Sequence, residues 1–541
     1  MVEHEAAQRG FISARPEPRP AALAGKWGSQ SDGTFVNPIV PADYSDIDAI
    51  AHDGHYYAIS STIHLSPGMT ILKSADLVNW RTTGHAVADT SVIDPGLSWR
   101  SMSRHGRGVW AGALRFHLGR FYIYFASPET GLQMTSAASM DGPWDPLHCV
   151  WAGANHNDPC PHWDENGDAW MVMTRFAGDP VDPRLYTIFL FRMSPDGRSL
   201  DFGSAIPIQH SRGAEASKLY RFGDDYYLFF SEVHEDRRVC MCKRAKTLLG
   251  LADAVAVQLN EVDPKIDKEP NQGAFLKDAA GAWWFLTHQG TGDWEGRALC
   301  LLPVTWRDRW PIIGLPGADG VGTMVWQSPG PVGMQPGSPP DLNDDFTGKT
   351  LRPHWEWSHA ARRDCWSLTE EPGRLRLRAF RPAREGFLGL GNVVSQRAWR
   401  TAENRVEVRL DYCGMLSGQR AGLCHMSREF VSIEVEFTEG RARLVCRYES
   451  TRHLVALPLS GKVWLATRWS ELGAAEFAYS LDGLGFAMLG ETSQLQWGHY
   501  RGDRVGLFTT TSGAELGHAD FDGFKYSIAG PEGIPDPART C

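Results

Sequence analysis

The stretch GHYYAIS, residues 54–60, decides the fold, because its pattern returns along the chain: a glycine, two variable residues, an aromatic, then apolar residues. It returns as GRFYIYF at 119–125, GDAWMVM at 167–173, GDDYYLFF at 223–230 and GAWWFLT at 281–287. A short signature repeated at roughly 50 residues is typical of propeller blades. The glycine supplies the turn dihedral, and the aromatic fills the gap between adjacent sheets. Five copies predict a five-bladed β-propeller.

A second unit follows the repeat. The segment 334–345, MQPGSPPDLNDD, is rich in Pro, Gly and Asp and lacks apolar periodicity, which predicts a linker. Beyond it, apolar and polar residues alternate in RLRLRAF (374–380), RVEVRLDY (405–412) and SIEVEF (432–437). Alternation of period two keeps one face of a sheet dry and the other wet. We therefore expect a jelly-roll-like β-sandwich, closed by DFDGFKYS at 520–527.

The chain is expected to be all-β, because long amphipathic helical periods are almost absent. Its 541 residues, 42% of them hydrophobic, are too many for one ordinary core. The predicted layout is an N-terminal extension at 1–32, a propeller at 33–333, a linker at 334–345, a sandwich at 346–528 and a tail at 529–541.

Composition excludes several partner classes. The formal net charge is -10, and Lys and Arg are scattered, so nucleic acid is not expected. No stretch is apolar enough for a bilayer span, and the N-terminus lacks the apolar core of a secretory signal. The ten cysteines sit at irregular spacings, which favours reduced thiols. We expect a cytoplasmic protein, and homo-oligomer formation is left open.

Candidate functional residues share one position of the repeat, about twelve residues before each aromatic. In a propeller, the first strand of a blade lines the central axis, so these positions should converge there. Three of the five are acidic. In chain order the residues are Asp46, Trp110, Asp158, Glu215 and Gln272.

Three carboxylates around one narrow channel repel each other, so function, a metal or strong hydrogen bonds must hold them there. Taken singly, Asp46 and Asp158 are equally well explained as turn or strand-end caps. Their shared phase with Glu215 favours a functional set. Hydrolysis of a glycosidic bond uses such a set directly, with one carboxylate activating water and another protonating the leaving oxygen.

At these residues the chain resembles glycoside hydrolase family 43, which contains five-bladed propeller β-xylosidases and α-L-arabinofuranosidases. The resemblance covers roughly 33–314 and rests on NPIVPADYSDIDAI around Asp46, NDPCPHWDENGDAW around Asp158 and GAEASKLYRFGDDYYLFFSE around Glu215. It implies that Asp46 is the general base, Asp158 the carboxyl that tunes the pKa of its neighbour, and Glu215 the general acid. It also implies inversion of the anomeric configuration and no required cofactor.

The resemblance assigns further pocket residues. Trp110 is similar to the family's active-site tryptophan, and Gln272 and Ile63 are expected to contact substrate. Arg297 is similar to an arginine that reaches sugar hydroxyls and steadies the acid. The alternatives are packing between blades for Trp110 and a surface position for Arg297.

His288 completes the set of candidates, as a residue on the channel axis that helps to hold a calcium ion or a water molecule, as in some relatives. A satisfied core histidine is the alternative. A structural propeller with Asp46, Asp158 and His288 as metal ligands is a further alternative.

The chain departs from the family beside each acid, with Ile47 after the base, Gly112 two residues after Trp110, and Ala216 after the acid. The expected substrate is a short xylo-oligosaccharide or a xyloside cut from the non-reducing end, and release of arabinose from arabinoxylan or arabinan is the close alternative. A propeller that binds carbohydrate without cleaving it is an alternative of another class. The resemblance also implies that a loop of the sandwich narrows the active site.

Overall fold

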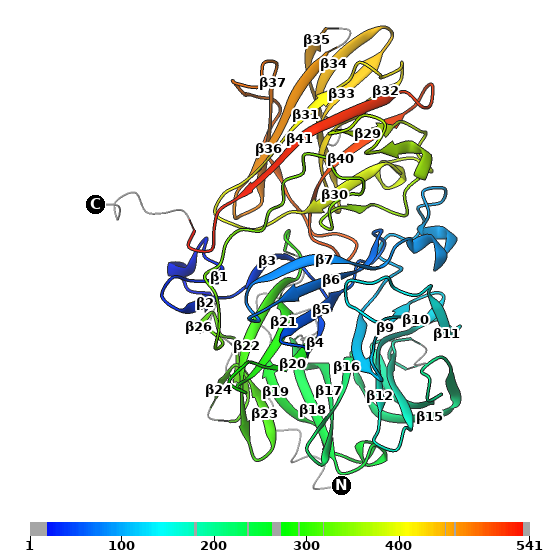
Figure 1. The fold of residues 1–541 in the computed structure, drawn as a ribbon, viewed down its shortest axis with the longest axis vertical. Helices are drawn as coiled ribbons and strands as arrows, with labels where there is room; N and C mark the ends of the chain where they lie inside the picture. The colour runs from blue at the N-terminus through cyan, green and yellow to red at the C-terminus, as the bar shows by residue number, and fades with distance from the viewer. Residues whose placement is uncertain are drawn as a thin grey trace.

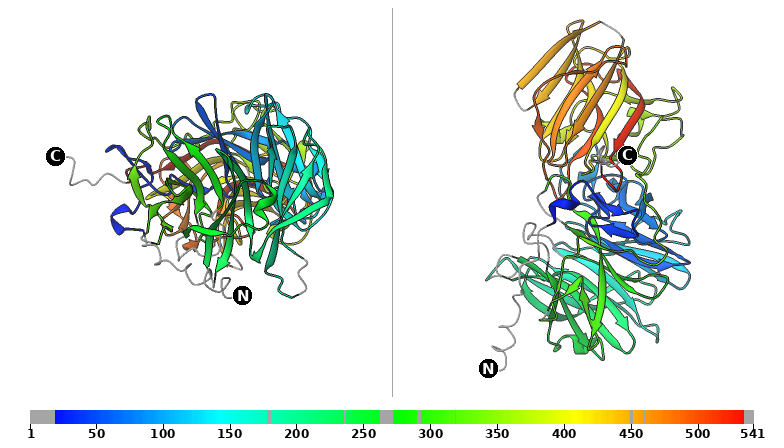
Figure 2. Two further views of the ribbon diagram at one scale, coloured as in Figure 1. Left: turned by 90° about the horizontal axis from the view of Figure 1, so that it is seen from below. Right: turned by 90° about the vertical axis from the view of Figure 1, so that its left-hand side faces the viewer.

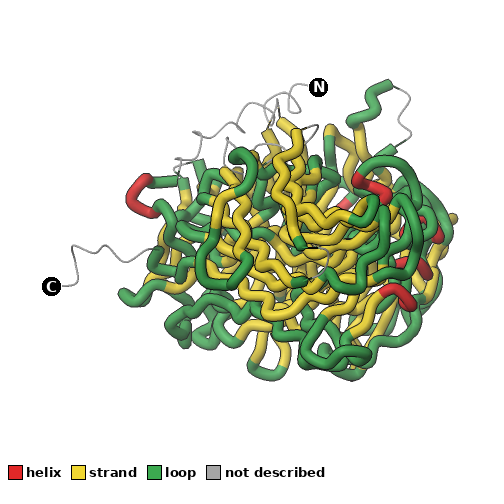
Figure 3. Tube along the Cα trace, turned by 90° about the horizontal axis from the view of Figure 1, so that it is seen from above, coloured by secondary structure: helices red, strands yellow, loops and turns green. Residues whose placement is uncertain are grey.

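A computed structural model describes residues 19–177, 181–234, 237–261, 272–289, 293–317, 319–448, 451–458 and 461–533. Strands and loops make up nearly all of this part of the chain, and the helices within it are short 3-10 turns (Figure 3). No helix among the described residues is long and apolar enough to cross a membrane. The predicted all-β fold is confirmed.

Two units stack along the long axis of the molecule, the N-terminal propeller below and the C-terminal sandwich above (Figure 1). The propeller contains sheets that each join four strands consecutive in the chain, in spatial order β4 to β7, β11 to β8, β12 to β15, β16 to β19 and β20 to β23. The strand bounds are β4 Asp48–His52, β5 His55–Ser60, β6 Gly68–Ser74, β7 Trp80–Val87, β8 Gly112–His117, β9 Arg120–Ser127, β10 Gly131–Ala137, β11 His148–Trp151, β12 His156–Trp163, β13 Ala169–Arg175, β14 Leu185–Met193, β15 Leu200–Arg212, β16 Glu215–Phe222, β17 Asp225–His234, β18 Arg237–Ala245, β19 Val257–Glu261, β20 Gly273–Lys277, β21 Trp283–Gln289, β22 Ala298–Arg307 and β23 Trp310–Ile313.

The repeated signature is the turn between the first two strands of each of these sheets. Its glycines have φ between 61° and 85°, a conformation that is strained for residues with a Cβ. The following apolar residues form the second strands β5, β9, β13, β17 and β21, which are largely buried. The repeat therefore places the first strand of every sheet in the same phase. The turn glycines are Gly54, Gly119, Gly167, Gly223 and Gly281.

Short strands join the ends of the propeller sequence. β3 (Val40–Asp43) pairs antiparallel with β22, so an early strand completes the last sheet. β24 (Leu315–Pro316) and β25 (Gly322–Thr323) extend the sheet of β19. β1 (Gly28–Ser29), β2 (Thr34–Val36) and β26 (Gln327–Pro329) form a separate small sheet. Residues 28–29, placed in the extension by the sequence, thus belong to a sheet.

The sandwich consists of two sheets, in the strand orders β27-β30-β40-β32-β33-β34-β35 and β28-β29-β41-β31-β36-β37-β38, with β39 paired to β37. The strand bounds are β27 Glu356–Trp357, β28 Trp366–Ser367, β29 Leu375–Arg378, β30 Val393–Arg397, β31 Asn404–Asp411, β32 Gln419–Met426, β33 Phe430–Thr438, β34 Arg441–Tyr448, β35 Thr451–Leu457, β36 Lys462–Trp469, β37 Ala474–Ser480, β38 Ala487–Met488, β39 Ser493–Gln494, β40 Arg504–Thr511 and β41 His518–Ile528. The short 3-10 turns are Ala21–Leu23, Thr90–Val92, Pro95–Leu97, Leu249–Leu251, Arg363–Cys365 and Phe387–Gly389.

The expected alternation of burial is confirmed in β29 and β31 but is wrong for β33. Glu434, on the face that the sequence predicts to be wet, has no exposed surface. Two arginines from the neighbouring strands, Arg420 and Arg447, cover its carboxylate and form ion pairs with it. Paired charges can be buried on a sheet face where an alternation pattern predicts solvent.

The two units share a boundary that is packed rather than open, and the right-hand view of Figure 2 shows them in direct contact. One hydrophobic cluster runs across it, with Trp27 and Trp294 from the propeller side and Trp399 from the sandwich. Within the predicted linker, Leu342 belongs to the same cluster. The segment 334–345 connects the units and is itself held against both.

Candidate active site

The residues that share the repeat phase lie where the first strand of each propeller sheet begins. Asp46 and Trp110 each stand two residues before β4 and β8, Gln272 directly precedes β20, and Glu215 is the first residue of β16. Asp158 lies near the start of β12. Equivalent strand ends converge at one end of the central channel. Residues that share one position of the repeat therefore meet at one site.

Irregular backbone turns the acids toward the channel. Asp46 and Asp158 have φ of 58° and 51°, as does Ala216 beside Glu215 at 59°. The register of β12 with β13 shifts between Asn157 and Cys160, and that of β16 with β17 shifts after Glu215. Bulges and positive φ at non-glycine residues carry a cost that folds retain mainly at functional sites.

A cavity of about 460 Å³ opens at this end of the channel. Its size lies within the usual range of small-ligand sites, about 300–1,000 Å³. Seven of the eight residues singled out from the sequence line it, and they are Asp46, Ile63, Trp110, Asp158, Glu215, Gln272 and Arg297.

Asp46 is held as an anion. Arg297 Nη1 lies 2.7 Å from its Oδ1, the Ser61 hydroxyl donates to its Oδ2, and its own backbone N–H donates to His288 Nδ1 at 2.8 Å. Burial alone would raise the pKa of Asp46, but the charges of Arg297 and His288 and the Ser61 bond outweigh it and lower that pKa below its usual value. An ionised carboxylate at a cavity wall can accept a proton from water.

Asp158 has the opposite electrostatic environment. Burial, and after it the neighbouring charge of Glu215, raise the pKa of Asp158 to about 7. The Ala216 N–H donates to its Oδ2 at 2.7 Å, and Gln272 donates to its Oδ1 at 3.4 Å. Asp158 therefore retains its proton up to near neutral pH beside Glu215.

Glu215 is positioned by a residue that the sequence did not single out. Arg238 Nη2 lies 2.7 Å from Glu215 Oε1, and Arg238 Nη1 donates to Gly213 O at 2.7 Å. The expectation that Arg297 steadies the acid is wrong, because Arg297 contacts Asp46 and reaches the site from the far end of the propeller sequence. Arg238 comes from β18, two strands after the acid in the same sheet.

Aromatic rings line the same cavity as the acids. The Trp110 ring lies 5.5 Å from that of Phe176 and 6.2 Å from that of Tyr500. Its Nε1 donates to Gly106 O at 3.1 Å, which fixes the plane of the indole. Ile63 reaches the cavity from a backbone with φ of 57°. Flat rings at a sugar-sized cavity suit the apolar faces of a pyranose or furanose.

The sandwich contributes to this cavity through His499 and Tyr500, which line it together with the propeller residues. Both have positive φ, at 53° and 62°, and the turn is closed by a bridge between Gly498 and Arg501. Arg297 Nη2 donates to Tyr500 O at 3.2 Å. The expected loop from the second domain is present, and it contacts the arginine that holds Asp46.

His288 stands behind the site rather than in its wall. Its Nδ1 accepts the Asp46 N–H, as a satisfied core histidine would. Within the described ranges, no three His, Cys, Asp or Glu side chains gather closely enough to hold a metal ion. Asp46, Asp158 and His288 thus do not form the ligand set of the structural-metal alternative.

Comparison with known proteins follows the same division of the chain. The model of glycosyl hydrolases family 43 matches residues 35–311, and that of the beta xylosidase C-terminal concanavalin A-like domain matches 343–527. The chain belongs to glycosyl hydrolase family 43. It is 31% identical to a beta-xylosidase of Formosa agariphila, over 94% of this chain and 93% of that protein. It is 26% identical to a non-reducing end alpha-L-arabinofuranosidase of Bacteroides ovatus, over 93% of this chain and 97% of that protein.

Among solved structures, the family 43 chain resembles a bifunctional GH43-CE protein of Bacteroides eggerthii, with a TM-score of 0.80 and 27% identity. The match covers 93% of this chain and 64% of that one. With these relatives and the cavity described above, the protein is a glycosidase. The site residues that sequence reasoning missed are Ser61, His105, Phe176, Tyr186, Arg238, His499 and Tyr500, none of which shares the phase of the repeat.

Proposed function

We propose that this glycosidase is an inverting, exo-acting β-xylosidase that removes xylose from the non-reducing end of xylo-oligosaccharides or from simple xylosides. The observation that carries the proposal is the electrostatic contrast within one cavity. Asp46 is kept ionised by Arg297, whereas burial and the charge of Glu215 keep Asp158 protonated up to about pH 7. Two carboxyl groups of opposite protonation are the requirement for inverting hydrolysis.

Asp46 acts as the general base. Its carboxylate takes a proton from a water molecule, which attacks the anomeric carbon from the face opposite the leaving group. Arg297 and Ser61 fix the two oxygens of this carboxylate. Inversion requires about 6.5–9.5 Å between the carboxyl groups of Asp46 and Glu215, which leaves room for that water.

Glu215 acts as the general acid and protonates the departing oxygen. Arg238 orients its carboxyl group, and Asp158 is the neighbour whose charge state governs the proton. Asp158 is therefore assigned the tuning role and does not contact the leaving group itself. Ala216 and Gln272 hold Asp158 in place.

Exo action follows from the part that the sandwich takes in the cavity. His499 and Tyr500 line it, with the Tyr500 ring beside that of Trp110, and so reduce the space left for a chain. A narrowed cavity accepts a terminal sugar more readily than the middle of a chain. The beta-xylosidase of Formosa agariphila, matched over nearly the whole chain, supports this substrate class.

Release of terminal arabinofuranose is the second candidate, supported by the match to the Bacteroides ovatus arabinofuranosidase. Both reactions use the same acids. Binding without catalysis is disfavoured, because a binding site has no need for an acid with a raised pKa in the same cavity as an ionised carboxylate.

The test is hydrolysis of 4-nitrophenyl β-D-xyloside and 4-nitrophenyl α-L-arabinofuranoside by wild type, Asp46→Ala and Glu215→Ala. We expect the xyloside to be the better substrate and Asp46→Ala to lose at least about a hundredfold in kcat. Glu215→Ala should lose less on these activated substrates, whose leaving group needs little protonation. NMR of the first product formed should show the inverted anomer. A retained anomer, or a wild type that binds xylo-oligosaccharides and cleaves neither substrate, would refute the proposal.

We further propose that the sheets of the propeller are five blades closed by the pairing of β3 with β22. A calcium ion on the axis near His288 stays a prediction, and no step above depends on it. The cytoplasmic location and homo-oligomer formation also stay predictions.

A further inference from the structure

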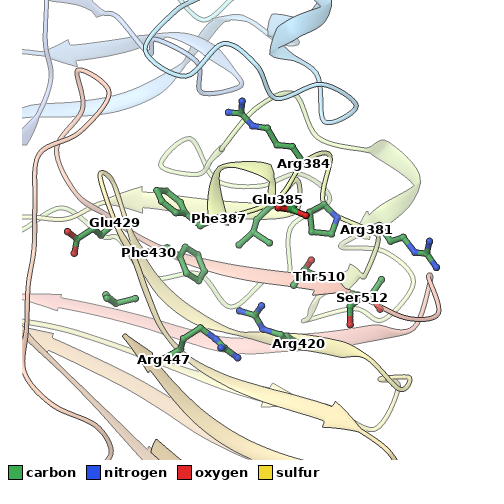
Figure 4. A pocket seen from close by; sticks show the side chains of 15 residues that line it. Arg381, Arg384, Glu385, Phe387, Arg420, Glu429, Phe430, Arg447, Thr510 and Ser512 are labelled. Atoms are coloured by element: carbon green, nitrogen blue, oxygen red, sulfur yellow. The ribbon is translucent and has the colours of Figure 1, made fainter. Parts of the chain in front are cut away.

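A second and larger cavity lies on the outer face of the seven-stranded sandwich sheet, away from the catalytic acids. It measures about 780 Å³ and is covered by loop 381–390 (Figure 4). Its floor is made by residues of β32, β33, β34 and β40. The volume again falls in the range of about 300–1,000 Å³ typical of ligand sites.

The floor of this sandwich cavity carries two oriented arginines. Arg420 donates through Nε and Nη2 to Glu434 at 2.8 and 2.9 Å, and Arg447 donates through the same atoms at 3.0 and 2.9 Å. Arg447 also lies 3.3 Å from Glu436. Each guanidinium keeps its Nη1 group without a bond to any residue that the structure describes. The Glu434 carboxylate thus fixes the orientation of both guanidinium groups, and each can still donate to a further acceptor.

The lining itself contains more arginine than glutamate. Four arginines and two glutamates line the cavity, and Glu434 and Glu436 pair with the two arginines of the floor. Figure 4 shows Arg420 and Arg447 on the sheet beneath the cavity, while Arg384 points away from it. The guanidinium groups placed to meet a ligand are therefore those of the floor.

One side of the sandwich cavity is aromatic. The rings of Phe387 and Phe430 lie 6.2 Å apart at 22°, and both side chains are partly exposed. Phe430 packs edge-on against the buried Phe508 at 5.1 Å, which fixes its plane. Such rings offer an apolar face to a sugar and leave the charged end of the cavity to a substituent.

A buried hydroxyl in this cavity has no partner. Thr510 Oγ1 is inaccessible to solvent and forms no hydrogen bond with any described residue. The adjacent Thr511 hydroxyl, in contrast, donates to Ala514 O at 3.1 Å. An unpaired buried hydroxyl is costly in the free protein, and a ligand hydroxyl would satisfy it.

We propose that the sandwich cavity is a second carbohydrate-binding site, which takes an oligosaccharide that bears a carboxylate. Arg420 and Arg447 bind the carboxylate, Thr510 bonds a sugar hydroxyl, and Phe387 with Phe430 contacts the ring. The choice of a xylan backbone with a uronic acid branch rests on the proposed function, whereas the preference for an acidic sugar does not. Leu388 of the covering loop accepts a hydrogen bond from His105, which lines the catalytic cavity. An oligosaccharide held here is therefore tethered to the molecule that cleaves it.

The test is isothermal titration of the full chain in an Asp46→Asn background, so that the ligand is not cleaved. The ligands are glucuronic-acid-substituted xylotriose and unsubstituted xylotriose. The variants are Arg447→Gln, Phe387→Ala and Thr510→Val. The control is Arg441→Gln, which changes an exposed arginine on the same strand. Thr510→Val removes only an unpaired hydroxyl and should fold normally, which keeps the test valid if Arg447→Gln is unstable.

We expect two sites for the acidic ligand, one of which weakens at least tenfold in Arg447→Gln and severalfold in Thr510→Val and Phe387→Ala. Arg441→Gln should bind as the parent does, and unsubstituted xylotriose should fill the second site at least tenfold more weakly. A single site that free xylose displaces would overturn the proposal, as would binding unaffected by all three variants. Activity of the same variants on nitrophenyl xyloside, with Asp46 restored, should be unchanged and reports on the catalytic proposal separately.

Discussion

Arg501 of the sandwich places its Nε 2.9 Å from Oδ2 of Asp43 in the propeller, and the two side chains are only 3% and 2% exposed. Arg501 Nη1 also donates to the backbone oxygen of Ser61 at 2.8 Å. The side-chain hydroxyl of the same serine donates to Asp46. The domain boundary and the residues around the catalytic base are therefore joined by a buried arginine of the sandwich.

Arg501→Met should destabilise the whole chain. Removing the arginine leaves the Asp43 carboxylate buried without its partner, a loss that typically costs about 3–5 kcal/mol of unfolding free energy. Denaturant unfolding of wild type and variant measures it. The control is Arg468→Met, which breaks an exposed pair with Glu476 and should cost less than about 1 kcal/mol. Equal effects of the two substitutions would contradict the role given to Arg501.

Arg238→Met should impair catalysis in a way that depends on the leaving group. Without the 2.7 Å contact, Glu215 loses the orientation needed to protonate the departing oxygen. Protonation matters most for a poor leaving group, so kcat should fall by about 10²–10³-fold on xylobiose and much less on nitrophenyl xyloside. A purely structural role would lower both rates by the same factor.

The pH profile should have an acidic and a basic limb, each set by the titration of a different carboxyl group. Because the pKa of Asp46 is lowered, kcat/KM should stay high down to a pH below the usual aspartate range, near 4. Because the pKa of Asp158 is raised to about 7 by burial and by the charge of Glu215, activity should fall as the pH rises through about 7 and Asp158 loses its proton.

Asp158→Asn tests the assignment of the basic limb. The substitution removes the carboxyl group whose raised pKa sets this limb, so the fall in activity should no longer lie near pH 7, while the acidic limb stays in place. The matched variant is Asp164→Asn, in an exposed turn of the same sheet, which should leave both limbs unchanged. A basic limb that does not move in Asp158→Asn would assign it to another group.

The part of the site carried by the repeat could be predicted from sequence, and the reason is geometric. Asp46, Asp158 and Glu215 each precede a glycine turn by nearly the same number of residues, and β-strand register converts that count into a position in space. Trp110 and Gln272 follow the same rule. Composition also predicted the all-β class, since no segment has a helical period.

Other contacts had no local signal. Arg238 meets Glu215 across two strands, and Tyr500 reaches Trp110 from another domain, so no spacing in the sequence links either pair. Glu434 shows a different limit. The alternation of apolar and polar residues in its strand predicts an exposed side chain. Arginines from both adjacent strands pair with Glu434 and bury it. Long-range pairing of charges decides such positions, and a single sequence does not display it.

A group of histidines at the domain boundary should make stability depend on pH. His64 and His105 come from the propeller, His359 and His499 from the sandwich, and the His359 ring lies 4.5 Å from that of His105 and 5.2 Å from that of His64. Burial, and then mutual repulsion, hold the pKa of His64 and of His359 well below the usual value and lower that of His105 to about 4.

Since these pKa values are lower in the folded state, the stability they contribute is complete above the unfolded value near 6.5 and is lost as the pH falls below it. One fully buried histidine contributes up to about 2 kcal/mol between pH 7 and pH 5. His359→Gln should therefore flatten the fall in Tm over that range. His148→Gln, at a surface hydrogen bond, should leave the slope as in wild type. An unchanged slope in His359→Gln would exclude the group as its source.

Tyr500→Ala should separate binding from chemistry. The ring of Tyr500 lies 6.2 Å from that of Trp110 in the lining of the catalytic cavity, while the contact of Tyr500 to Arg297 is made by its backbone carbonyl. Alanine removes the ring and keeps the carbonyl, so Asp46 and its arginine should remain in place. Loss of an aromatic wall costs about 1–1.5 kcal/mol, which corresponds to an increase in KM of about tenfold.

In the same variant kcat on nitrophenyl xyloside should change less than about twofold, because the acids are untouched. Tyr500→Phe is the matched variant, since it keeps the ring and removes only the hydroxyl, and it should behave as wild type does. If Tyr500→Phe raised KM as much as Tyr500→Ala, a hydrogen bond from the hydroxyl would be responsible instead of the ring. If kcat fell while KM stayed constant, the sandwich loop would act on the acids themselves and not on the fit of the terminal sugar.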